Sequence, residues 1–272
     1  MGNFDYNRSG FIVRNDLKEA YREFWATLAQ PGSWWDGSER VAIASASRTA
    51  LECPFCEERK SALSPYQMGG EHRTIGPEEG LLNGLVIDAV HRIVTDQSRI
   101  TQAYVERLQD AGISKEHYVE LVGVVVTCIS IDEFNRALGL PLEPLPEPKS
   151  GKPSGYRPEA IEEGIGFVPM LRSNGAVGVE ADLWGKVAPN VVRALSLVPD
   201  AVRSWMKVAN VQYAMGNLLD FSADTGRSID RAQMELVAGR VSAINECFYE
   251  ESVYADDLNA YRVFPAHVDN ST

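Results

Sequence analysis

Apolar side chains recur every three or four positions along most of this chain, the spacing that puts them on one face of an α-helix. The first such stretch covers residues 18–28, and the polar residues Asn15 and Asp16 ahead of it are candidate caps. Further helices are predicted over residues 39–51, 53–63, 81–94, 100–109, 115–138, 191–196, 200–211 and 229–249. The pattern therefore predicts an all-α fold.

Serine residues before three of these stretches are predicted caps, because a serine oxygen can accept a hydrogen bond from a free N–H of the first turn. They are Ser38, Ser114 and Ser228. Residues 121–129, which follow Ser114, are rich in valine and could form a strand. Their flanks have helical spacing and no partner strand is predicted elsewhere, so we expect one long helix that ends at Gly139.

Residues 140–158 break the helical pattern, because prolines and glycines recur throughout them. Proline removes a backbone donor and cannot continue a helix. The stretch is predicted to be an extended linker or a wrapping arm on the surface. It would separate an N-terminal helical half, residues 1–139, from a C-terminal helical half, residues 159–272.

Length and charge narrow the classes of function. A chain of 272 residues can form one large or two medium domains with a sizeable core. Its net charge of −12 argues against a broad nucleic-acid surface, which needs clustered lysine and arginine. No apolar run has the length of a membrane span, and the first residues lack the apolar core of a signal peptide. We expect a cytoplasmic enzyme or enzyme relative without a nucleic-acid or membrane partner.

Two cysteines three positions apart, Cys53 and Cys56, are the strongest candidates for chemistry. Pro54 suits the first turn of a helix, so Cys53 is expected at the helix start and Cys56 one turn further in. Free N–H groups and the helix dipole favour the thiolate there, and the thiolate is the reactive form. Sulfurs one turn apart can also form and break a disulfide, so the pair predicts a redox site.

Two other interpretations of the pair stay open. A structural zinc usually takes four ligands, but Cys128 and Cys247 stand alone in the sequence and the histidines are scattered along it. No metal or other cofactor is therefore predicted. The pair could also be inert, because free cysteine often behaves as a small core residue. Cys128 lies in an apolar run and is itself predicted to be a core thiol.

A short internal repeat suggests two related halves, because residues 235–250 echo residues 41–56 and align Cys247 with Cys53. The sequence resembles the alkylhydroperoxidase D-like and carboxymuconolactone decarboxylase superfamily, and more narrowly its two-part peroxidase-related members. The resemblance covers most of the chain. It is carried by residues 40–44 leading to 53–56, by residues 118–123 leading to 134–139, and by residues 228–236 leading to 247–249.

This resemblance implies a helical bundle, often a homo-oligomer, whose C-x-x-C pair reduces a small hydroperoxide and is itself reduced by an external dithiol. In the family, a glutamate twelve residues before the first cysteine and a histidine four after the second form a proton relay. Val41 and Lys60 stand at these positions in the first half. In the second half Glu235 precedes Cys247 as the family pattern requires, but Glu250 replaces the second cysteine. Neither half has the full relay.

The expected reaction begins when one thiolate attacks a peroxide oxygen, and the resulting sulfenic acid then condenses with the other thiol. The family pattern makes Cys56 the attacking residue, whereas the helix start favours Cys53, so the order stays open. Lys60 and Arg59 could lower a thiol pKa through their positive charge.

Candidate proton donors are His72, in a glycine-rich stretch, and His91, because histidine titrates in the useful range. Glu235 near Cys247 is an acid–base candidate by resemblance alone. The alternative function is a helical relative that has lost catalysis and binds a small molecule or a protein partner. A decarboxylase-like activity comes third, because that branch of the superfamily does not depend on the cysteine pair.

Overall fold

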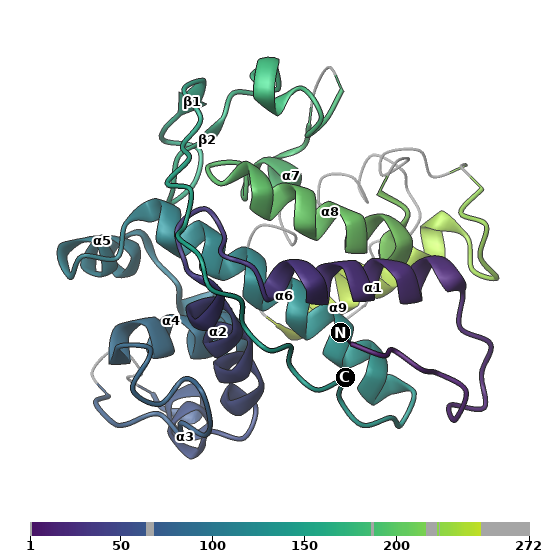
Figure 1. Cartoon of the computed structure of the whole chain (residues 1–272), viewed down its shortest axis with the longest axis horizontal. Coiled ribbons are helices and arrows are strands. Elements are labelled where there is room, and N and C mark those ends of the chain that lie inside the picture. The colour runs from purple at the N-terminus through teal and green to yellow at the C-terminus, as the bar shows by residue number, and fades with distance from the viewer. Residues whose placement is uncertain (1, 64–67, 186–187, 216–221, 223, 246–272) are drawn as a thin grey trace, which may run out of the picture. The chain divides into compact units, whose positions relative to one another are not determined.

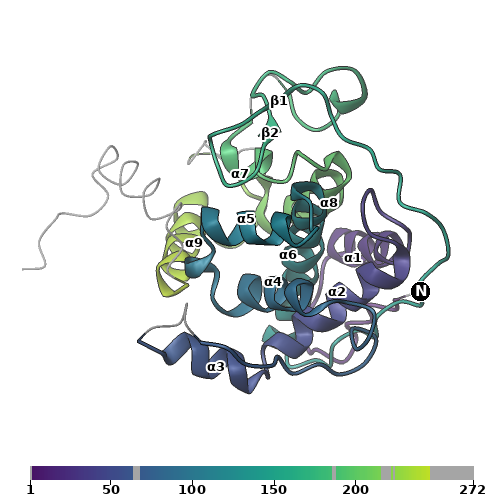
Figure 2. The same ribbon diagram turned by 90° about the vertical axis from the view of Figure 1, so that its left-hand side faces the viewer.

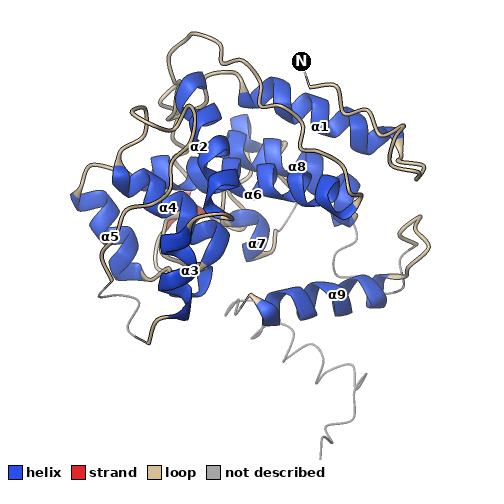
Figure 3. Cartoon of the chain, turned by 90° about the horizontal axis from the view of Figure 1, so that it is seen from below, coloured by secondary structure: helices blue, strands red, loops and turns tan. Residues whose placement is uncertain are grey.

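The computed structural model describes residues 2–63, 68–185, 188–215, 222 and 224–245, and its regular structure is almost entirely helical (Figure 1, Figure 3). Its α-helices are α1 (Asn15–Leu28), α2 (Gly37–Ala50), α3 (Pro54–Ser61), α4 (Gly84–Thr95), α5 (Gln102–Asp110), α6 (Lys115–Ala137), α7 (Asn190–Arg193), α8 (Pro199–Tyr213) and α9 (Arg231–Ile244). The expected all-α character is confirmed. Two strands that were not predicted, β1 (Ile161–Glu162) and β2 (Met170–Leu171), pair antiparallel.

Two compact units make up the chain, Met1–Gly216 and Asn217–Thr272. All helices up to α8 belong to the first unit, and α9 belongs to the second. The proposed relationship between residues 1–139 and 159–272 as repeated halves stays a prediction. In the described residues, no helix is both long and apolar enough to span a bilayer.

Two predicted serine caps are wrong, and the structure shows why. Asp36 caps α2, because its carboxylate accepts the Glu39 N–H at 2.9 Å while the Glu39 carboxylate accepts the Asp36 N–H at 2.9 Å. Asp230 forms the same reciprocal arrangement at the start of α9. This capping box satisfies two free N–H groups at once, which Ser38 and Ser228 cannot do alone.

Of the two other predicted helix starts, one is confirmed and one is wrong. Ser114 caps α6 as predicted, since its side chain accepts the His117 N–H. α1 begins at Asn15 without a side-chain cap, so Asn15 and Asp16 lie in its first turn and not before it. Asp16 still complements the helix dipole from that position.

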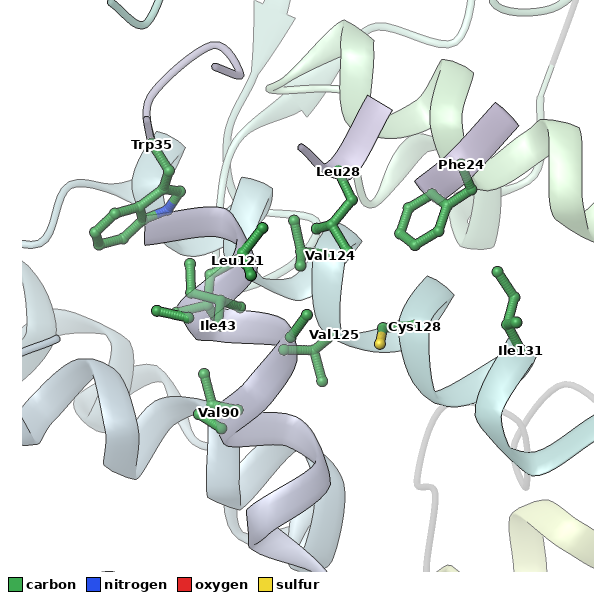
Figure 4. Close-up of a cluster of buried hydrophobic side chains, with 14 of the residues drawn as sticks. Phe24, Leu28, Trp35, Ile43, Val90, Leu121, Val124, Val125, Cys128 and Ile131 are labelled. Atoms are coloured by element: carbon green, nitrogen blue, oxygen red, sulfur yellow. The ribbon is translucent and has the colours of Figure 1, made fainter. Parts of the chain in front are cut away.

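The core is built around α6, which contacts α2, α4 and α8, while α1 packs on α8. The valine-rich stretch is helical as expected, because side chains on most sides of α6 are covered by neighbouring helices. Figure 4 shows part of this cluster, with Phe24, Leu28, Trp35, Ile43, Val90, Leu121, Val124, Val125, Cys128 and Ile131. Cys128 is fully buried there, which confirms it as a core thiol.

Small residues let α2 approach its neighbours closely, since Ala42, Ala44 and Ala46 are all fully buried. A salt bridge also joins α2 to α6, in which both oxygens of Asp132 accept hydrogen bonds from Arg48 at 2.7 and 2.8 Å. α2 therefore has a fixed position, and it carries the chain directly to the cysteine pair.

Residues 140–158 are the wrapping arm that was one of the two expectations. They contain no helix or strand and bond to the end of α1 and the turn that follows it. The Lys149 N–H donates to the Ala29 carbonyl at 2.8 Å, and the Gly155 N–H donates to the Ser33 carbonyl at 2.7 Å. The prolines thus keep the arm extended, while N–H groups such as those of Lys149 and Gly155 attach it to the preceding helix and turn.

Helix α3 lies at the edge of this unit, next to α4 (Figure 1, Figure 2). Only Cys56 and Arg59 are buried among its 8 residues. Little hydrocarbon therefore holds α3 in place, and polar contacts must supply much of its attachment.

Candidate functional site

The cysteine pair has the geometry that the sequence predicted. Cys53 is the N-cap of α3, Pro54 occupies the first turn and Cys56 lies one turn further in. The two sulfur atoms are 3.6 Å apart and no disulfide joins them. A disulfide needs about 2 Å, so a small approach of the two side chains would close it. Both cysteines are buried, with 3% and 1% of their surfaces exposed.

Two histidines converge on these sulfurs from different parts of the chain. His72 comes from the loop after α3, and its Nδ1 lies 3.4 Å from Cys56 Sγ and 3.8 Å from Cys53 Sγ. His91 comes from α4, and its Nδ1 lies 3.3 Å from Cys56 Sγ. One sulfur or ring nitrogen from each of the four residues falls within 4.8 Å of all the others. The expectation that the histidines are scattered holds along the sequence but is wrong in space.

Asp88 holds His72 in this orientation. Its carboxylate accepts a hydrogen bond from His72 Nε2 at 2.9 Å, from Arg59 at 2.6 Å, and from Arg92 and Tyr104 at 2.8 Å each. Burial alone would raise the pKa of Asp88, but hydrogen bonds from His72, Arg92 and Tyr104 hold it well below its usual value. The carboxylate therefore stays charged and keeps Nδ1 of His72 directed at the sulfurs.

The contribution of α4 follows from helical spacing. Asp88, His91 and Arg92 are three and four positions apart, so they share a face of the helix, and that face meets α3. Val86 and Val90 are buried with the apolar core. An acid followed at this spacing by a histidine and an arginine is a signal that could have identified this polar face from the sequence.

Hydrogen bonding distinguishes the two thiols. Burial would raise the pKa of the Cys53 thiol, but the backbone N–H groups of Arg73 and Cys56, together with His72, lower it from 9.0 to about 7. The Arg73 nitrogen lies 3.3 Å from Cys53 Sγ. Burial raises the pKa of the Cys56 thiol to about 12. Burial and the nearby His72 also lower the pKa of His91 to about 3, so that ring is neutral.

Arg59 and Lys60 were both expected to lower a thiol pKa through their positive charge, and the charge of Arg59 acts in that direction on the pKa of Cys56, against the larger effect of burial. Arg59 is buried between two acids, at 2.6 Å from Asp88 and 3.9 Å from Asp96. Lys60 directly follows the buried Arg59. Consecutive residues of a helix point about 100° apart, so the Lys60 side chain is turned away from that of Arg59 and is exposed. We therefore assign no role at the sulfurs to Lys60.

The loop that carries His72 and Arg73 contacts both sulfurs and is itself held firmly. The His72 ring meets the Phe55 ring edge-on, with centroids 5.0 Å apart. Gly70 passes so close to Phe55 that a Cβ there would lie 2.4 Å from the ring. Further along the loop, the buried Glu78 carboxylate accepts the Thr49 hydroxyl at 2.9 Å and the Ile75 N–H at 2.8 Å. The loop therefore packs against Phe55 of α3 and brings His72 to the two buried sulfurs.

The predicted second site lies in the other unit. Glu235 is on α9 and forms a salt bridge with Arg231 at 2.7 Å, one turn earlier in the same helix. Cys247 lies outside the described residues. The acid–base role of Glu235 toward Cys247 stays a prediction.

Comparisons of this chain with protein-family models, curated proteins and solved structures found no match. The resemblance described above therefore stays a prediction, and the chemistry of the site has to be argued from its own geometry.

Proposed function

We propose that this chain is a thiol-dependent oxidoreductase that reduces small hydroperoxides at Cys53 and Cys56. One observation carries the proposal: the two sulfurs lie 3.6 Å apart, and Nδ1 of His72 is within 3.8 Å of both. Two thiols at this distance can close to a disulfide, and a histidine between them can move the protons that the reaction requires. The superfamily resemblance supports the same activity, with an alkylhydroperoxidase D-like bundle, a homo-oligomer and an external dithiol as reductant.

The Cys53 thiolate attacks the terminal oxygen of the hydroperoxide, and the O–O bond breaks. His72 Nδ1, which has taken the Cys53 thiol proton, gives that proton to the departing alkoxide, which leaves as the alcohol, and Cys53 becomes a sulfenic acid. The Cys56 sulfur then attacks Cys53, water leaves and the disulfide forms. Two thiols and one hydroperoxide thus give one disulfide, one alcohol and one water, and an external dithiol restores the thiols.

Cys53 takes the attacking role in this scheme because two backbone N–H groups stabilise its thiolate, those of Arg73 and Cys56. Cys56 is the more deeply buried sulfur and keeps its proton. This order is the reverse of the one that the family pattern implies. Both cysteines are buried, which restricts access to their sulfurs, so small peroxides are the expected substrates.

Thiol counting tests this function directly. Chelator-treated protein exposed to a brief pulse of hydrogen peroxide should lose two free thiols per chain, and dithiothreitol should restore both. The Cys53→Ala variant should lose none, because Cys56 alone lacks a stabilised thiolate. The matched control is Cys128→Ala, which removes a core thiol and should still lose two. Unchanged thiols in the wild type under excess peroxide would instead favour a relative that has lost catalysis and binds a small molecule or partner.

The pH dependence of alkylation tests which sulfur is reactive. In chelator-treated protein, alkylation of Cys53 by iodoacetamide should rise with pH and level off above about pH 7, the value to which its pKa is lowered. Below that pH the rate should fall about tenfold per unit, because only the thiolate reacts. Cys56, with its pKa raised to about 12, should stay unmodified between about pH 5 and 9. Peptide mass spectrometry measures both sites, and equal rates at the two cysteines would contradict the assignment.

A further inference from the structure

We infer that Cys53, Cys56, His72 and His91 form a four-coordinate zinc site. This inference goes beyond the proposed function, because it stands on the arrangement of four side chains and requires no reaction. Only its regulatory consequence, given below, rests on the proposed function.

The separations match a tetrahedral ion. Zn–S bonds of ~2.3 Å and Zn–N bonds of ~2.05 Å place two sulfurs ~3.8 Å apart and a sulfur ~3.6 Å from a nitrogen. The Cys53 and Cys56 sulfurs are 3.6 Å apart, and three of the four sulfur–nitrogen distances are 3.3, 3.4 and 3.8 Å. No separation in the set exceeds 4.8 Å, so side-chain adjustments of little more than ~1 Å would complete the tetrahedron.

The surroundings of the buried His91 imidazole favour a metal ion at its Nδ1. His91 is fully buried, its Nδ1 faces Cys56 Sγ, and its Nε2 has no hydrogen-bond partner within the described residues. A buried polar ring with so few polar contacts costs free energy. A metal bond at Nδ1 would give this ring a strong contact that a neutral thiol does not.

The surroundings also have the form of a metal site. His72 directs Nδ1 at the cluster while Asp88 bonds its Nε2 at 2.9 Å. Metal-binding histidines usually donate their other ring N–H to a carboxylate, a backbone carbonyl or a water, and such a partner fixes the ring and raises its basicity. The Arg73 N–H to Cys53 Sγ contact would likewise stabilise a thiolate ligand.

A zinc ion would explain how α3 is attached. Cys56 and Arg59 are the only buried residues of this helix, so it has almost no apolar face to bind it to α4. A zinc ion would join the start of α3, the loop that carries His72, and α4 through His91. Four protein ligands also close the coordination sphere, which is typical of structural zinc.

The regulatory consequence follows from the shared residues. A sulfur bound to zinc and enclosed by four ligands is not available to a peroxide. If the proposed function holds, zinc-loaded protein should therefore lose its two thiols to peroxide much more slowly than chelator-treated protein.

Elemental analysis and Co²⁺ titration test the site. Protein purified without chelator should carry about one zinc per chain, and chelator-treated protein should bind Co²⁺ with the intense visible bands of tetrahedral coordination and a sulfur-to-cobalt absorption. Zn²⁺ should displace the Co²⁺. Wild-type protein without bound zinc and without a tetrahedral Co²⁺ spectrum would overturn the inference, and this result does not depend on any variant.

Variants identify the ligands. His91→Asn should weaken Co²⁺ binding by about 100-fold or more. Replacing a residue that only hydrogen-bonds a metal ligand already lowers metal affinity by about 10–100-fold, and loss of a ligand should lower it further. His117→Gln is the matched control, because His117 lies beside Trp34 and Trp35 and should bind as the wild type does. Wild-type affinity in His91→Asn would remove this residue from the site and overturn the four-ligand assignment. Peroxide-driven thiol loss in chelator-treated protein tests the proposed function without metal, so either proposal can fail alone.

Discussion

The Asp88→Asn variant is expected to unfold with about 3 kcal/mol less free energy than the wild type. The two side chains have the same shape, so the change removes charge and leaves packing intact. Arg59 and Arg92, which are 1% and 11% exposed, would then face a neutral amide. Asp96 still faces Arg59, so the expected loss of unfolding free energy lies at the low end of what breaking a buried ion pair usually costs.

The control for this prediction is Asp182→Asn. Asp182 accepts two hydrogen bonds from Arg203, at 2.7 and 2.8 Å, but its side chain is 58% exposed. Water solvates both charges there, so the loss should stay below about 1 kcal/mol. Urea unfolding monitored by circular dichroism measures both variants. Equal losses of unfolding free energy in the two variants would mean that the burial of Asp88 and its arginine partners is not what makes their contacts stabilising.

The Asp88→Asn variant should also weaken the inferred metal site. A neutral amide in place of the carboxylate can no longer hold a charged contact to His72, so Co²⁺ affinity should fall by about 10–100-fold. If stability falls and Co²⁺ binding does not, Asp88 supports the arginines but does not position His72.

Gly37→Ala is the second prediction with a large effect, a loss of about 1–3 kcal/mol from overpacking. Gly37 is the first residue of α2, directly after its cap Asp36. A Cβ at this position would lie 2.5 Å from the Ala29 carbonyl oxygen and 2.6 Å from the Lys149 carbonyl oxygen. Both obstacles are backbone atoms, so either the wrapping arm or the end of α1 has to move.

Gly84→Ala is its matched control. Gly84 is likewise the first residue of a helix, α4, and follows the cap Asn83. A Cβ there meets no atom within 4 Å, so alanine should be neutral or should stabilise by up to about 1 kcal/mol through its higher helix propensity. Thermal and urea unfolding of the pair separate the crowding at Gly37 from any general cost of replacing a helix-start glycine. Similar behaviour of the two variants would contradict the close approach of the arm.

Much of the local structure was readable from the sequence, because it depends on neighbours a few positions apart. Helical periodicity predicted the long helix now seen as α6, and the position of Pro54 predicted that Cys53 lies at the start of α3. The caps of α2 and α9 could also have been predicted from the sequence. An acid followed three positions later by glutamate or glutamine is the sequence signature of a capping box.

Local spacing and composition were enough to establish the all-helical fold, the helix-start position of Cys53 and Cys56, and the burial of Cys128 in the core. What surrounds the two sulfurs was settled by packing alone. His72 and His91 follow Cys56 by 16 and 35 positions, and they meet it because a loop folds back over α3 while α4 packs beside it. Such convergence depends on contacts between separate elements, and no pattern within one element records it.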